Sequence, residues 1–524
     1  MINHQLVNLA ADRLFTVPVD ELSKIMNAVL IPISRNSKMR LLTAKNKDGI
    51  YVIHTAVCSN EFRLSGLDAP DLLQLVSVED ANKSTTLHKA AEHGSATVIA
   101  DLLNGVELAD RLKLLIAQDT ELSTPVHKAA GESGKVEVMS ALLEGVEEED
   151  AMKLMTLTDK DLSTPIHKAC SRRDDGVMVG FLLGKISSPG NKLTLLAMVD
   201  GEQSTPLHLA AQLYKNSVCL RNLLEGIDVG DKLNLLAMLD SERSTPLHLA
   251  ADLPGNAETI QYFLTGIDIA DKLKLLTMLN DNNSSTLHYA ASNYRGVDMI
   301  GCLLDGLELA DKLQLLMLQD IEKTTPLHRA TSIAGNCDVI KVLFEGLEMS
   351  NKIQLLMMQD STQSIPLHGA ADRMKNASVV DLLLDGVESD DKFKLLTMQN
   401  NQLATALHKA TDWRGNQDVI KVLLAGLGSG ERMKLLTMQT CDGSTPLHKA
   451  AARMDSSESI RNLLDGIEYG DKIKLLLLRD SKRSTPFHAA TKSGDAEAME
   501  PLSDIRESGM NCYSYYLSFV LFYF

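Results

Sequence analysis

Apolar side chains recur along the chain in three short groups, and the same three groups return about every 40 residues. Within each group the spacing follows one face of an α-helix rather than the strict alternation of a strand. From residue 231 onward the groups are Leu233, Leu235 and Leu236, then Leu247, Ala250 and Ala251, then Ile260, Phe263 and Leu264. The pattern predicts three short helices in each unit.

One histidine marks the register of this repeat. Twelve of the 14 histidines occupy the same place in successive units, and they are His54, His88, His127, His167, His208, His248, His288, His328, His368, His408, His448 and His488. From His208 onward every step is 40 residues, and the earlier steps are 34, 39, 40 and 41. A length of 524 residues would otherwise suggest three or four domains. The repeat predicts one array instead.

Start and stop signals support the predicted helices. Thr245 is a suitable N-cap, Pro246 fits the first helical position, and His248 then lies within reach of the threonine hydroxyl. Gly266 is placed to end the second helix. Asp228 is a plausible N-cap for the third helix, which we expect over residues 231–239.

These residues resemble the ankyrin repeat, whose signature D-x-x-G-x-T-P-L-H-x-A-A continues to L-L-x-x-G. The resemblance covers nearly the whole chain and implies an all-α, ankyrin-type helical repeat solenoid that binds proteins. Two features depart from the family: the period is 40 rather than about 33 residues, and the hairpin glycine remains only at Gly49 and Gly443. In this family, β-hairpin fingers project between the repeats, and we expect them to be reduced to turns here. The glycine after the second helix recurs at Gly105, Gly145, Gly184, Gly226, Gly266, Gly306, Gly346, Gly386, Gly426 and Gly466.

The ends of the array differ from its middle. Residues 1–46 are expected to form a divergent N-terminal capping unit, since a terminal repeat must shield the first interface. Residues 47–500 are expected to hold twelve ankyrin-like repeats. Pro501 falls inside the expected second helix of the last unit, so residues 501–524 are predicted to be an irregular tail rich in Tyr and Phe.

Composition narrows the chemistry. The net charge of −17 argues against general nucleic-acid binding. Seven irregularly spaced cysteines favour a reducing compartment over a disulfide scaffold. No secretory signal is visible near the first residue, and no stretch is long and apolar enough to span a membrane. A cytoplasmic location is expected.

The histidine ladder does not predict a metal site. Equivalent residues of stacked repeats lie about 8–10 Å apart, whereas zinc requires its ligands at about 2.0–2.3 Å from one ion. We therefore interpret the histidines as helix-capping groups. No nucleophile motif, phosphate loop or zinc-protease motif is present. The sequence predicts a non-catalytic protein without a cofactor or metal.

Variable positions on the first helix indicate a binding surface. Basic residues follow the register histidine at Lys89, Lys128, Lys168, Arg329, Lys409 and Lys449. The candidate partner-binding residues lie at the end of the same helix, and they are Arg172, Arg173, Tyr214, Lys215, Tyr294, Arg295, Arg373, Lys375, Trp413, Arg414 and Arg453. In ankyrin-like stacks this helix lines the concave face, and Trp, Tyr and Arg are enriched in binding hot spots.

The resulting hypothesis is a scaffold that binds another protein along this face, with an acidic and partly apolar segment as the partner. Two alternatives stay open. The chain could be an ankyrin-repeat effector of an intracellular bacterium that acts in the host cytosol. It could also be a peripheral membrane adaptor that uses the aromatic residues from Tyr513 to Phe524, which are too few to span a bilayer but could insert at its interface.

Overall fold

A computed structural model describes residues 17–30, 33–45, 50–59, 61–64, 66–132, 134–173, 176–214, 216–494 and 496–507. The chain divides into two compact units, residues 1–271 (unit 1) and 272–524 (unit 2), and each is described by itself. The described residues form helices and turns, with two isolated β-bridges and no strand. The all-α prediction is confirmed.

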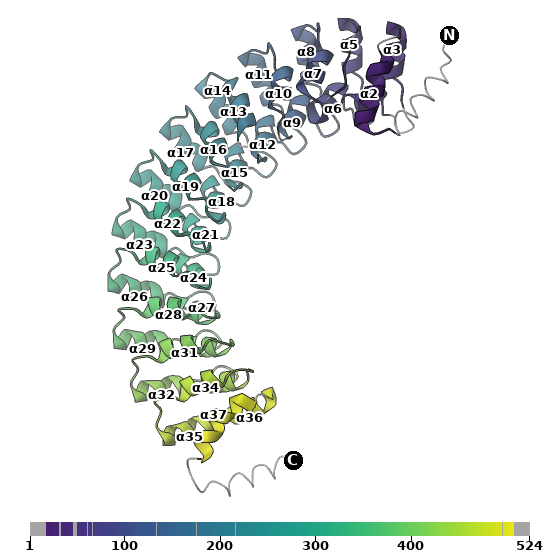
Figure 1. Cartoon of the computed structure of the whole chain (residues 1–524). Helices are drawn as coiled ribbons and strands as arrows, with labels where there is room; N and C mark the ends of the chain where they lie inside the picture. The colour runs from purple at the N-terminus through teal and green to yellow at the C-terminus, as the bar shows by residue number, and fades with distance from the viewer. Residues whose placement is uncertain are drawn as a thin grey trace. The chain divides into compact units, whose positions relative to one another are not determined.

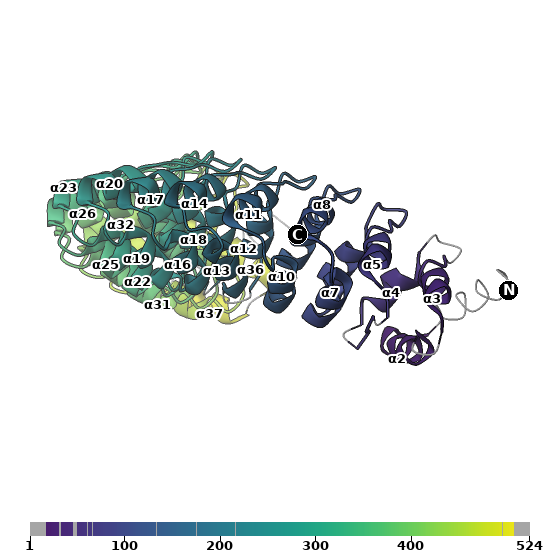
Figure 2. The ribbon, with the colours of Figure 1, turned by 90° about the horizontal axis from the view of Figure 1, so that it is seen from above.

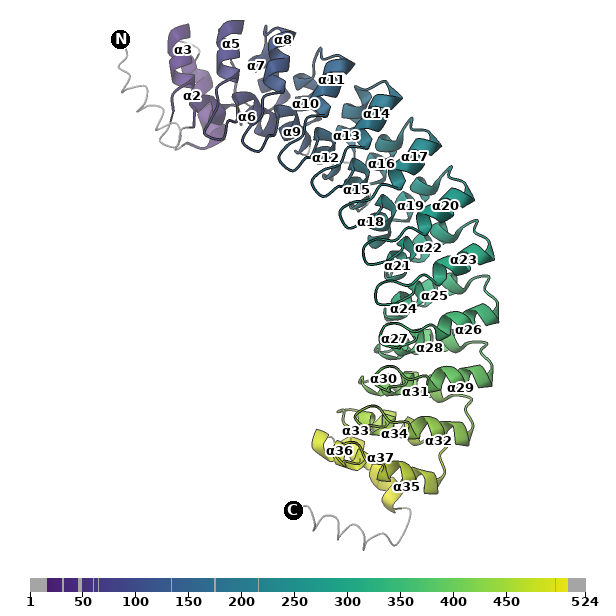
Figure 3. The same ribbon diagram turned by 180° about the vertical axis from the view of Figure 1, so that it is seen from behind.

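Each regular repeat contributes three short helices, and within each unit the helices line up in three rows with the second helices in the middle (Figure 1 and Figure 3). In unit 1 the first helices are α4 (Val52–Ala56), α6 (Thr86–His93), α9 (Pro125–Ala130), α12 (Pro165–Cys170), α15 (Pro206–Ala211) and α18 (Pro246–Asp252). The second helices are α7 (Ala96–Leu103), α10 (Val136–Leu142), α13 (Val177–Gly184), α16 (Ser217–Leu224) and α19 (Ala257–Leu264). The third helices are α5 (Ala69–Val76), α8 (Leu108–Leu115), α11 (Glu148–Met155), α14 (Pro189–Leu196) and α17 (Val229–Leu236).

Helix α20 (Ile269–Leu276) spans the division between the units. In unit 2 the first helices are α21 (Thr286–Ala291), α24 (Pro326–Thr331), α27 (Pro366–Ala371), α30 (Ala406–Thr411), α33 (Pro446–Ala451) and α36 (Pro486–Ser493). The second helices are α22 (Val297–Leu304), α25 (Cys337–Phe344), α28 (Ala377–Leu384), α31 (Gln417–Leu424), α34 (Ser457–Leu464) and α37 (Ala496–Glu507). The third helices are α23 (Leu309–Leu316), α26 (Met349–Met357), α29 (Ser389–Thr397), α32 (Ser429–Thr437) and α35 (Tyr469–Leu477).

The core of each unit lies where these rows meet. Leu247, Ala250 and Ala251 of α18 are buried, as are Ile260 and Phe263 of α19. Equivalent small and branched residues are buried in the other repeats, so successive first helices approach closely through their alanines. Each repeat buries its apolar side chains against its neighbours rather than in a core of its own, as a solenoid requires.

The third helix forms where the extra residues of the 40-residue period predict it. Asp228 caps α17 by accepting a hydrogen bond from the backbone N–H of Asp231 at 2.9 Å, and Leu235 and Leu236 are buried. The helix runs from Val229 to Leu236. It therefore overlaps the predicted segment, residues 231–239, but starts and ends earlier.

A cation on each of several third helices ties it to the next repeat. The ammonium of Lys352 on α26 donates to the carbonyl oxygens of Leu382 and Asp385, at 3.2 and 2.6 Å, at the end of α28. The same cation–carbonyl pairs join Lys232 to Tyr262 and Thr265, Lys272 to Cys302 and Asp305, Lys312 to Val342 and Glu345, Lys392 to Ala425, and Arg432 to Asp465. These carbonyls lie at or just beyond a helix C-terminus, where acceptors lack intrahelical partners, so each cation satisfies a helix end and joins two repeats. The carbonyl of Val342 also accepts the N–H of Glu345 at 3.3 Å.

A short turn precedes each first helix, as expected from the shortened fingers. In the turn before α18, the Asp240 carboxylate accepts the N–H groups of Glu242 and Ser244 at 3.0 and 2.7 Å. The backbone N–H of Ser241 donates to the carbonyl oxygen of Glu202 in the preceding repeat at 2.8 Å. The turn therefore closes on an aspartate and also bonds to its neighbour.

The fourth residue of this turn lies in the left-handed region of the backbone although it is rarely glycine. Its φ lies between +52° and +61° at Lys83, Leu122, Leu162, Gln203, Arg243, Asn283, Lys323, Gln363, Leu403 and Arg483. Gly443 has a φ of +74° at the same place. A side chain in this conformation costs about 1–2 kcal/mol relative to ordinary helical geometry. The chain accepts this strain where the ankyrin signature has glycine.

The glycine at the end of the second helix shows one exception to the predicted pattern. Gly266 has a φ of +81° just beyond α19, as expected of a left-handed helix stop. Gly184, in contrast, is the last residue of α13, and its φ is not positive. The expectation that all ten glycines stop a helix is therefore wrong for Gly184, because Gly184 is itself the last helical residue and Lys185 forms the C-cap.

The ends of the array depart from the regular unit. Between α4 and α5 the described residues contain no second helix, which accounts for the 34-residue step from His54 to His88. Helix α2 (Val19–Leu30) packs against α4, with α3 (Arg35–Leu42) beside it (Figure 2). Residues 1–16 of the predicted capping unit lie outside the described residues.

At the other end, helix α37 continues through Pro501 to Glu507. The prediction that an irregular tail begins at residue 501 is therefore wrong for residues 501–507. Pro501 and Leu502 are buried, and α37 packs on α34, α35 and α36. This packing outweighs the backbone hydrogen bond that proline removes. Residues 508–524, which include the aromatic segment, lie outside the described residues.

The left-handed turn position makes a stability prediction. Gln203→Gly should raise the free energy of unfolding by about 0.5–1 kcal/mol, because relief of the strained φ exceeds the extra chain entropy of glycine. Urea denaturation followed by circular dichroism measures the change. Gly443→Ala is the reverse variant and should destabilise, because its Cβ would also lie 2.7 Å from the backbone nitrogen of Ser481. If Gln203→Gly and Gly443→Ala changed the free energy of unfolding in the same direction and by the same amount, φ would not be the cause of the change.

The cation–carbonyl pairs make a second stability prediction. Lys352→Met keeps the aliphatic stem but removes the ammonium from two helix-end carbonyls, and it should cost about 1–2 kcal/mol of stability. Lys394→Met is the matched control, because the Lys394 side chain is exposed on α29 and forms no hydrogen bond or ion pair among the described residues. Its substitution should change the urea midpoint little. Similar losses for both variants would argue against the helix-capping role.

Candidate protein-binding surface

The predicted partner-binding residues lie at the loop between the first and second helices of their repeats. In unit 1, Arg172 and Arg173 follow α12, and Arg172 pairs with Glu132 of the preceding repeat at 3.6 Å. Tyr214 follows α15 and is exposed. Lys215 lies outside the described residues.

In unit 2 these loops bond to one another across repeats. The indole N–H of Trp413 donates to a carboxylate oxygen of Asp372 at 2.7 Å. Arg453 reaches Asp412 at 3.4 Å, and the guanidinium of Arg373 donates to the carbonyl oxygen of Ser332 at 2.7 Å. Each contact joins residues 41 positions apart, so the loops of neighbouring repeats form a continuous row.

The remaining predicted residues of unit 2 belong to the same row. Arg414 pairs with Asp455 of the next repeat at 3.2 Å. The backbone N–H of Lys375 donates to the side-chain oxygen of Asn416 at 3.1 Å. The guanidinium of Arg295 stacks over the ring of Tyr294, 5.3 Å from its centroid.

Large apolar side chains project from this row. Tyr294 is 63% exposed, Met374 46%, Trp413 40% and Met454 50%. Met374 and Met454 were not among the predicted binding residues, although each stands six residues after a register histidine, at the place of Tyr214 and Tyr294. The equivalent position was therefore a usable signal. We call Tyr294, Arg373, Met374, Trp413, Arg414, Arg453 and Met454 the loop ridge of unit 2.

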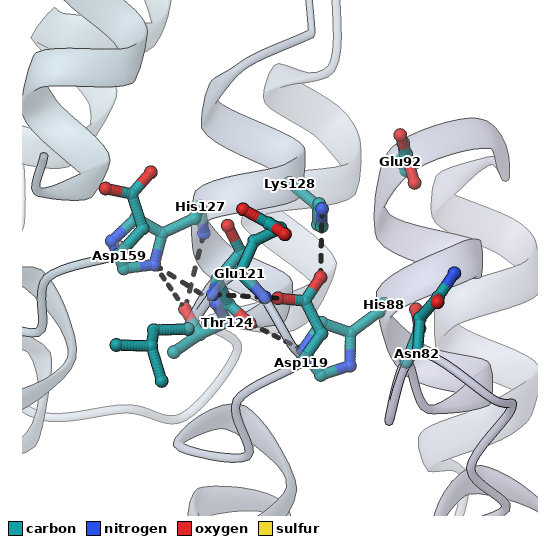
Figure 4. A network of polar contacts seen from close by, with 12 residues as sticks. Asn82, His88, Glu92, Asp119, Glu121, Thr124, His127, Lys128 and Asp159 are labelled. Carbon is teal, nitrogen blue, oxygen red and sulfur yellow. Dashed lines mark hydrogen bonds and ion pairs between the residues drawn. The ribbon is translucent and has the colours of Figure 1, made fainter. Parts of the chain in front are cut away.

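The basic residues that follow the register histidines are not free to form a charged stripe. The Lys128 ammonium lies 3.0 Å from the carboxylate of Asp119 in its own turn (Figure 4). Burial would raise the pKa of Asp119, but the hydrogen bond and charge of Lys128 outweigh it and lower the pKa. The equivalent ion pairs are Lys89–Asp80, Lys168–Asp159 and Arg329–Asp320. Lys449 pairs with Asp442 at a later position of its own turn, and Lys409 pairs with Asp372 of the preceding repeat. The sequence showed the cations but not that an aspartate neutralises each one.

The register histidines cap their own helix and bond to the next repeat. In the repeat of α9, Nδ1 of His127 lies 3.2 Å from the Thr124 backbone nitrogen and 2.8 Å from its hydroxyl oxygen (Figure 4). Nε2 lies 3.0 Å from the carbonyl oxygen of Ser163. A carbonyl only accepts, so Nε2 carries the proton, while Nδ1 accepts from Thr124. This arrangement requires a neutral imidazole.

The same pair of contacts recurs through both units. The Nε2–carbonyl bonds of 2.9–3.2 Å join His88 to Ser123, His167 to Ser204, His208 to Ser244, His288 to Thr324, His328 to Ser364, His368 to Ala404, His408 to Ser444 and His448 to Ser484. Burial lowers the pKa to about 4 at His127, His288, His368 and His408. The helix-capping interpretation of these residues is consistent with every one of these contacts.

His54 is an exception, and Tyr51 stands at its N-cap, where most other repeats have threonine. Its Nε2 bonds to the carbonyl oxygen of Val78 at 2.9 Å, while its buried Nδ1 has no hydrogen-bond partner in the described chain. A cavity of about 390 Å³ lies beside it, and Cys58 and His93 line this cavity. Burial raises the pKa of the Cys58 thiol to about 11, so it is a poor nucleophile at neutral pH.

Metal chemistry has no site in the part of the chain that the structure describes. No three histidine, cysteine, aspartate or glutamate side chains gather there as a metal would require. The ladder geometry explains this, because the imidazoles with both contacts use both ring nitrogens within the repeat frame, and among the described residues His54 stands alone with a free buried Nδ1. The side chains of this surface can bind a partner by apolar contact, hydrogen bonding and ion pairing.

The histidine contacts predict how stability depends on pH. Their folded pKa values lie below the unfolded value of about 6.5, so the unfolded chain binds more protons between these two values. The stabilisation is therefore complete above pH 6.5 and is lost as the pH falls toward 4. Each histidine contributes up to about 1.4 kcal/mol per pH unit in this window. Urea midpoints measured at pH 7, 6 and 5 should fall steeply.

A matched pair of variants assigns this pH dependence to the ladder. His127→Gln should lower stability at pH 7 and flatten the fall between pH 7 and 5, because one buried titrating group is gone. His93→Gln removes an exposed histidine and should leave both the midpoint and its pH dependence nearly unchanged. A pH dependence that survives in His127→Gln and disappears in His93→Gln would contradict the assignment.

Comparison with protein families agrees with this geometry. A family model for ankyrin repeats in three copies matches residues 175–273, and a single ankyrin-repeat model matches residues 442–471. No curated protein matches the chain in sequence. Among the described residues, no helix has the length and apolar character needed to cross a bilayer. Family models thus detect ankyrin repeats in this chain, and a third helix lengthens its repeats to 40 residues.

Proposed function

We propose that this protein is a non-catalytic scaffold that binds another protein through the loop ridge of unit 2. The observation that carries the proposal is the exposure of Met374, Trp413 and Met454 in three successive repeats, beside arginines. Aromatic, methionine and arginine side chains are the types enriched in the cores of protein interfaces. Ankyrin repeats in general serve as protein-interaction modules, and the contacts between loops hold this ridge in place before binding.

The charges of the ridge favour a partner with an acidic and partly apolar segment. Arg414 and Arg453 already pair with Asp455 and Asp412. On binding an acidic partner, each arginine would replace the carboxylate of its aspartate with one from the partner. Arg373 lies in no ion pair within the described residues and can accept a new carboxylate directly. The apolar contacts should therefore supply most of the affinity, while the charges set its specificity. The net charge of −17 disfavours nucleic acid on this surface.

We place this activity in a reducing compartment such as the cytosol. The cysteines at positions 58, 170, 219, 302, 337 and 441 are free thiols, which fits the few and irregular cysteines of the sequence. Action in a host cytosol as a bacterial effector would use the same surface. Membrane attachment through residues 513–524 concerns a segment outside the described residues, and a vesicle-sedimentation assay of the full chain would test it.

The test begins with the full-length protein immobilised to capture partners from a cytosolic extract. The captured protein is then purified and titrated by calorimetry. Trp413→Ala should weaken binding by about 2 kcal/mol, the scale of a central interface anchor. Trp413→Phe keeps an aromatic ring but removes the N–H bonded to Asp372, and it should weaken binding less. Affinity should fall only modestly with added salt, because the arginines exchange carboxylates.

Leu477→Ala is the matched control, since Leu477 is an exposed apolar residue on third helix α35 of the same unit. It should leave the dissociation constant unchanged. A partner whose affinity is indifferent to both Trp413→Ala and Arg414→Glu would place the interface elsewhere in the chain.

A further inference from the structure

Two adjacent turns of unit 1 display leucine at the strained left-handed position. Leu122 and Leu162 both have a φ of +57°. Their side chains are 46% and 53% exposed. Each therefore combines an unfavourable backbone conformation with an apolar side chain that remains in water. Neither property helps the fold, since glycine at the same place would remove both.

The neighbouring turns show that leucine is not required here. Lys83 and Gln203 occupy the equivalent positions on either side, with φ values of +56° and +55°, and their polar ends remain solvated. A strained backbone together with an exposed apolar side chain is a combination found preferentially at functional sites. The leucine pair is thus the part of this row in unit 1 with no structural explanation, and Leu403 of unit 2 shows the same combination singly, with a φ of +56° and 47% exposure.

Hydrogen bonds hold the two turns side by side. The backbone N–H of Lys160 donates to the carbonyl oxygen of Glu121 at 2.8 Å, and their side chains form an ion pair at 3.2 Å. The side-chain amide of Gln118 donates to the carbonyl oxygens of Leu122 and Thr158, at 2.9 and 3.2 Å. The leucines are therefore presented in a fixed arrangement, so binding would cost little further ordering.

The charges around the pair are acidic toward the following turn, while Lys83 of the preceding turn is basic. Lys160 is neutralised by Glu121. Asp161 and Glu202 are exposed on the same row of turns, and no ion pair among the described residues involves either carboxylate. A partner that covers the leucines would meet this negative charge at the edge of the contact.

We propose that Leu122 and Leu162 form a docking site for a protein segment with two apolar residues flanked by lysine or arginine. Equivalent positions of stacked repeats lie about 8–10 Å apart. This spacing matches residues three apart in a polyproline II segment, which lie on one face and span about 9 Å, because this conformation has three residues per turn. The site rests on the proposed protein-binding function, but it lies in the other unit and selects a basic rather than an acidic segment.

The experiment uses the full-length protein and a random 12-residue peptide library displayed on phage. We expect selected peptides to carry two apolar residues about three positions apart with neighbouring Lys or Arg. Synthetic versions should bind the variant with Leu122→Gly and Leu162→Gly about tenfold or more weakly, because two buried leucine contacts are lost. The same variant should unfold at a higher urea concentration, since it relieves two strained positions.

The matched control carries Lys83→Gly and Gln203→Gly in the two flanking turns. It should gain stability in the same way but bind the peptides unchanged. A further variant, Leu122→Asn with Leu162→Asn, keeps side chains that tolerate the left-handed region and should lose binding as the glycine variant does.

Three outcomes would overturn the proposal: failure to select peptides, selected peptides whose binding survives both leucine variants, or a lower unfolding midpoint for the glycine variant. Each concerns unit 1 alone. The proposed function fails separately, when captured partners ignore Trp413→Ala and Arg414→Glu. A peptide that binds the leucine pair while Trp413 proves irrelevant would relocate the interface without removing the protein-binding role.

Discussion

The bond between each register histidine and the next repeat is the constraint on which the rest of the structure depends. Nδ1 of His408 faces the hydroxyl of Thr405 at 2.9 Å, and its Nε2 donates to the carbonyl oxygen of Ser444 at 3.2 Å. One neutral side chain therefore starts a helix and joins it to the following turn. Because the His408 imidazole is buried between repeats, burial lowers its pKa and favours the neutral form, and both of its ring nitrogens are occupied by these two contacts.

The longer repeat adds a second set of contacts between neighbouring repeats. A standard repeat of about 33 residues has no third helix, whereas here the third helices carry lysines whose ammonium groups reach helix-end carbonyls of the following repeat. Burial lowers the pKa of Lys232, Lys272, Lys312, Lys352 and Lys392. Histidine on the first helix and lysine on the third thus join neighbouring repeats at two separated places, which opposes twisting about either one.

Because these two sets of contacts hold the backbone in place, the side chains of the loops and turns can vary without loss of the fold. The loop ridge of unit 2 uses this freedom to expose aromatic and methionine side chains, with arginines bonded to aspartates of adjacent repeats. The turns of unit 1 use it differently, through leucines in a conformation that glycine would adopt more easily. Both surfaces are built from positions that the repeat signature does not specify.

The sequence by itself determined the repeat, its three helices, the caps at Thr245 and Asp228, and the role of the histidines, because these follow from local spacing and from hydrogen-bonding capacity. It also located most of the loop ridge. Only the tertiary structure decided that Lys128 is neutralised by Asp119, that Lys352 caps a helix in another repeat, and that α37 continues through Pro501. The ion pair of Lys128 with Asp119 depends on how its own turn folds. The other two outcomes depend on which groups approach across repeats, and contacts between residues 30–41 positions apart leave no mark on the local pattern of the chain.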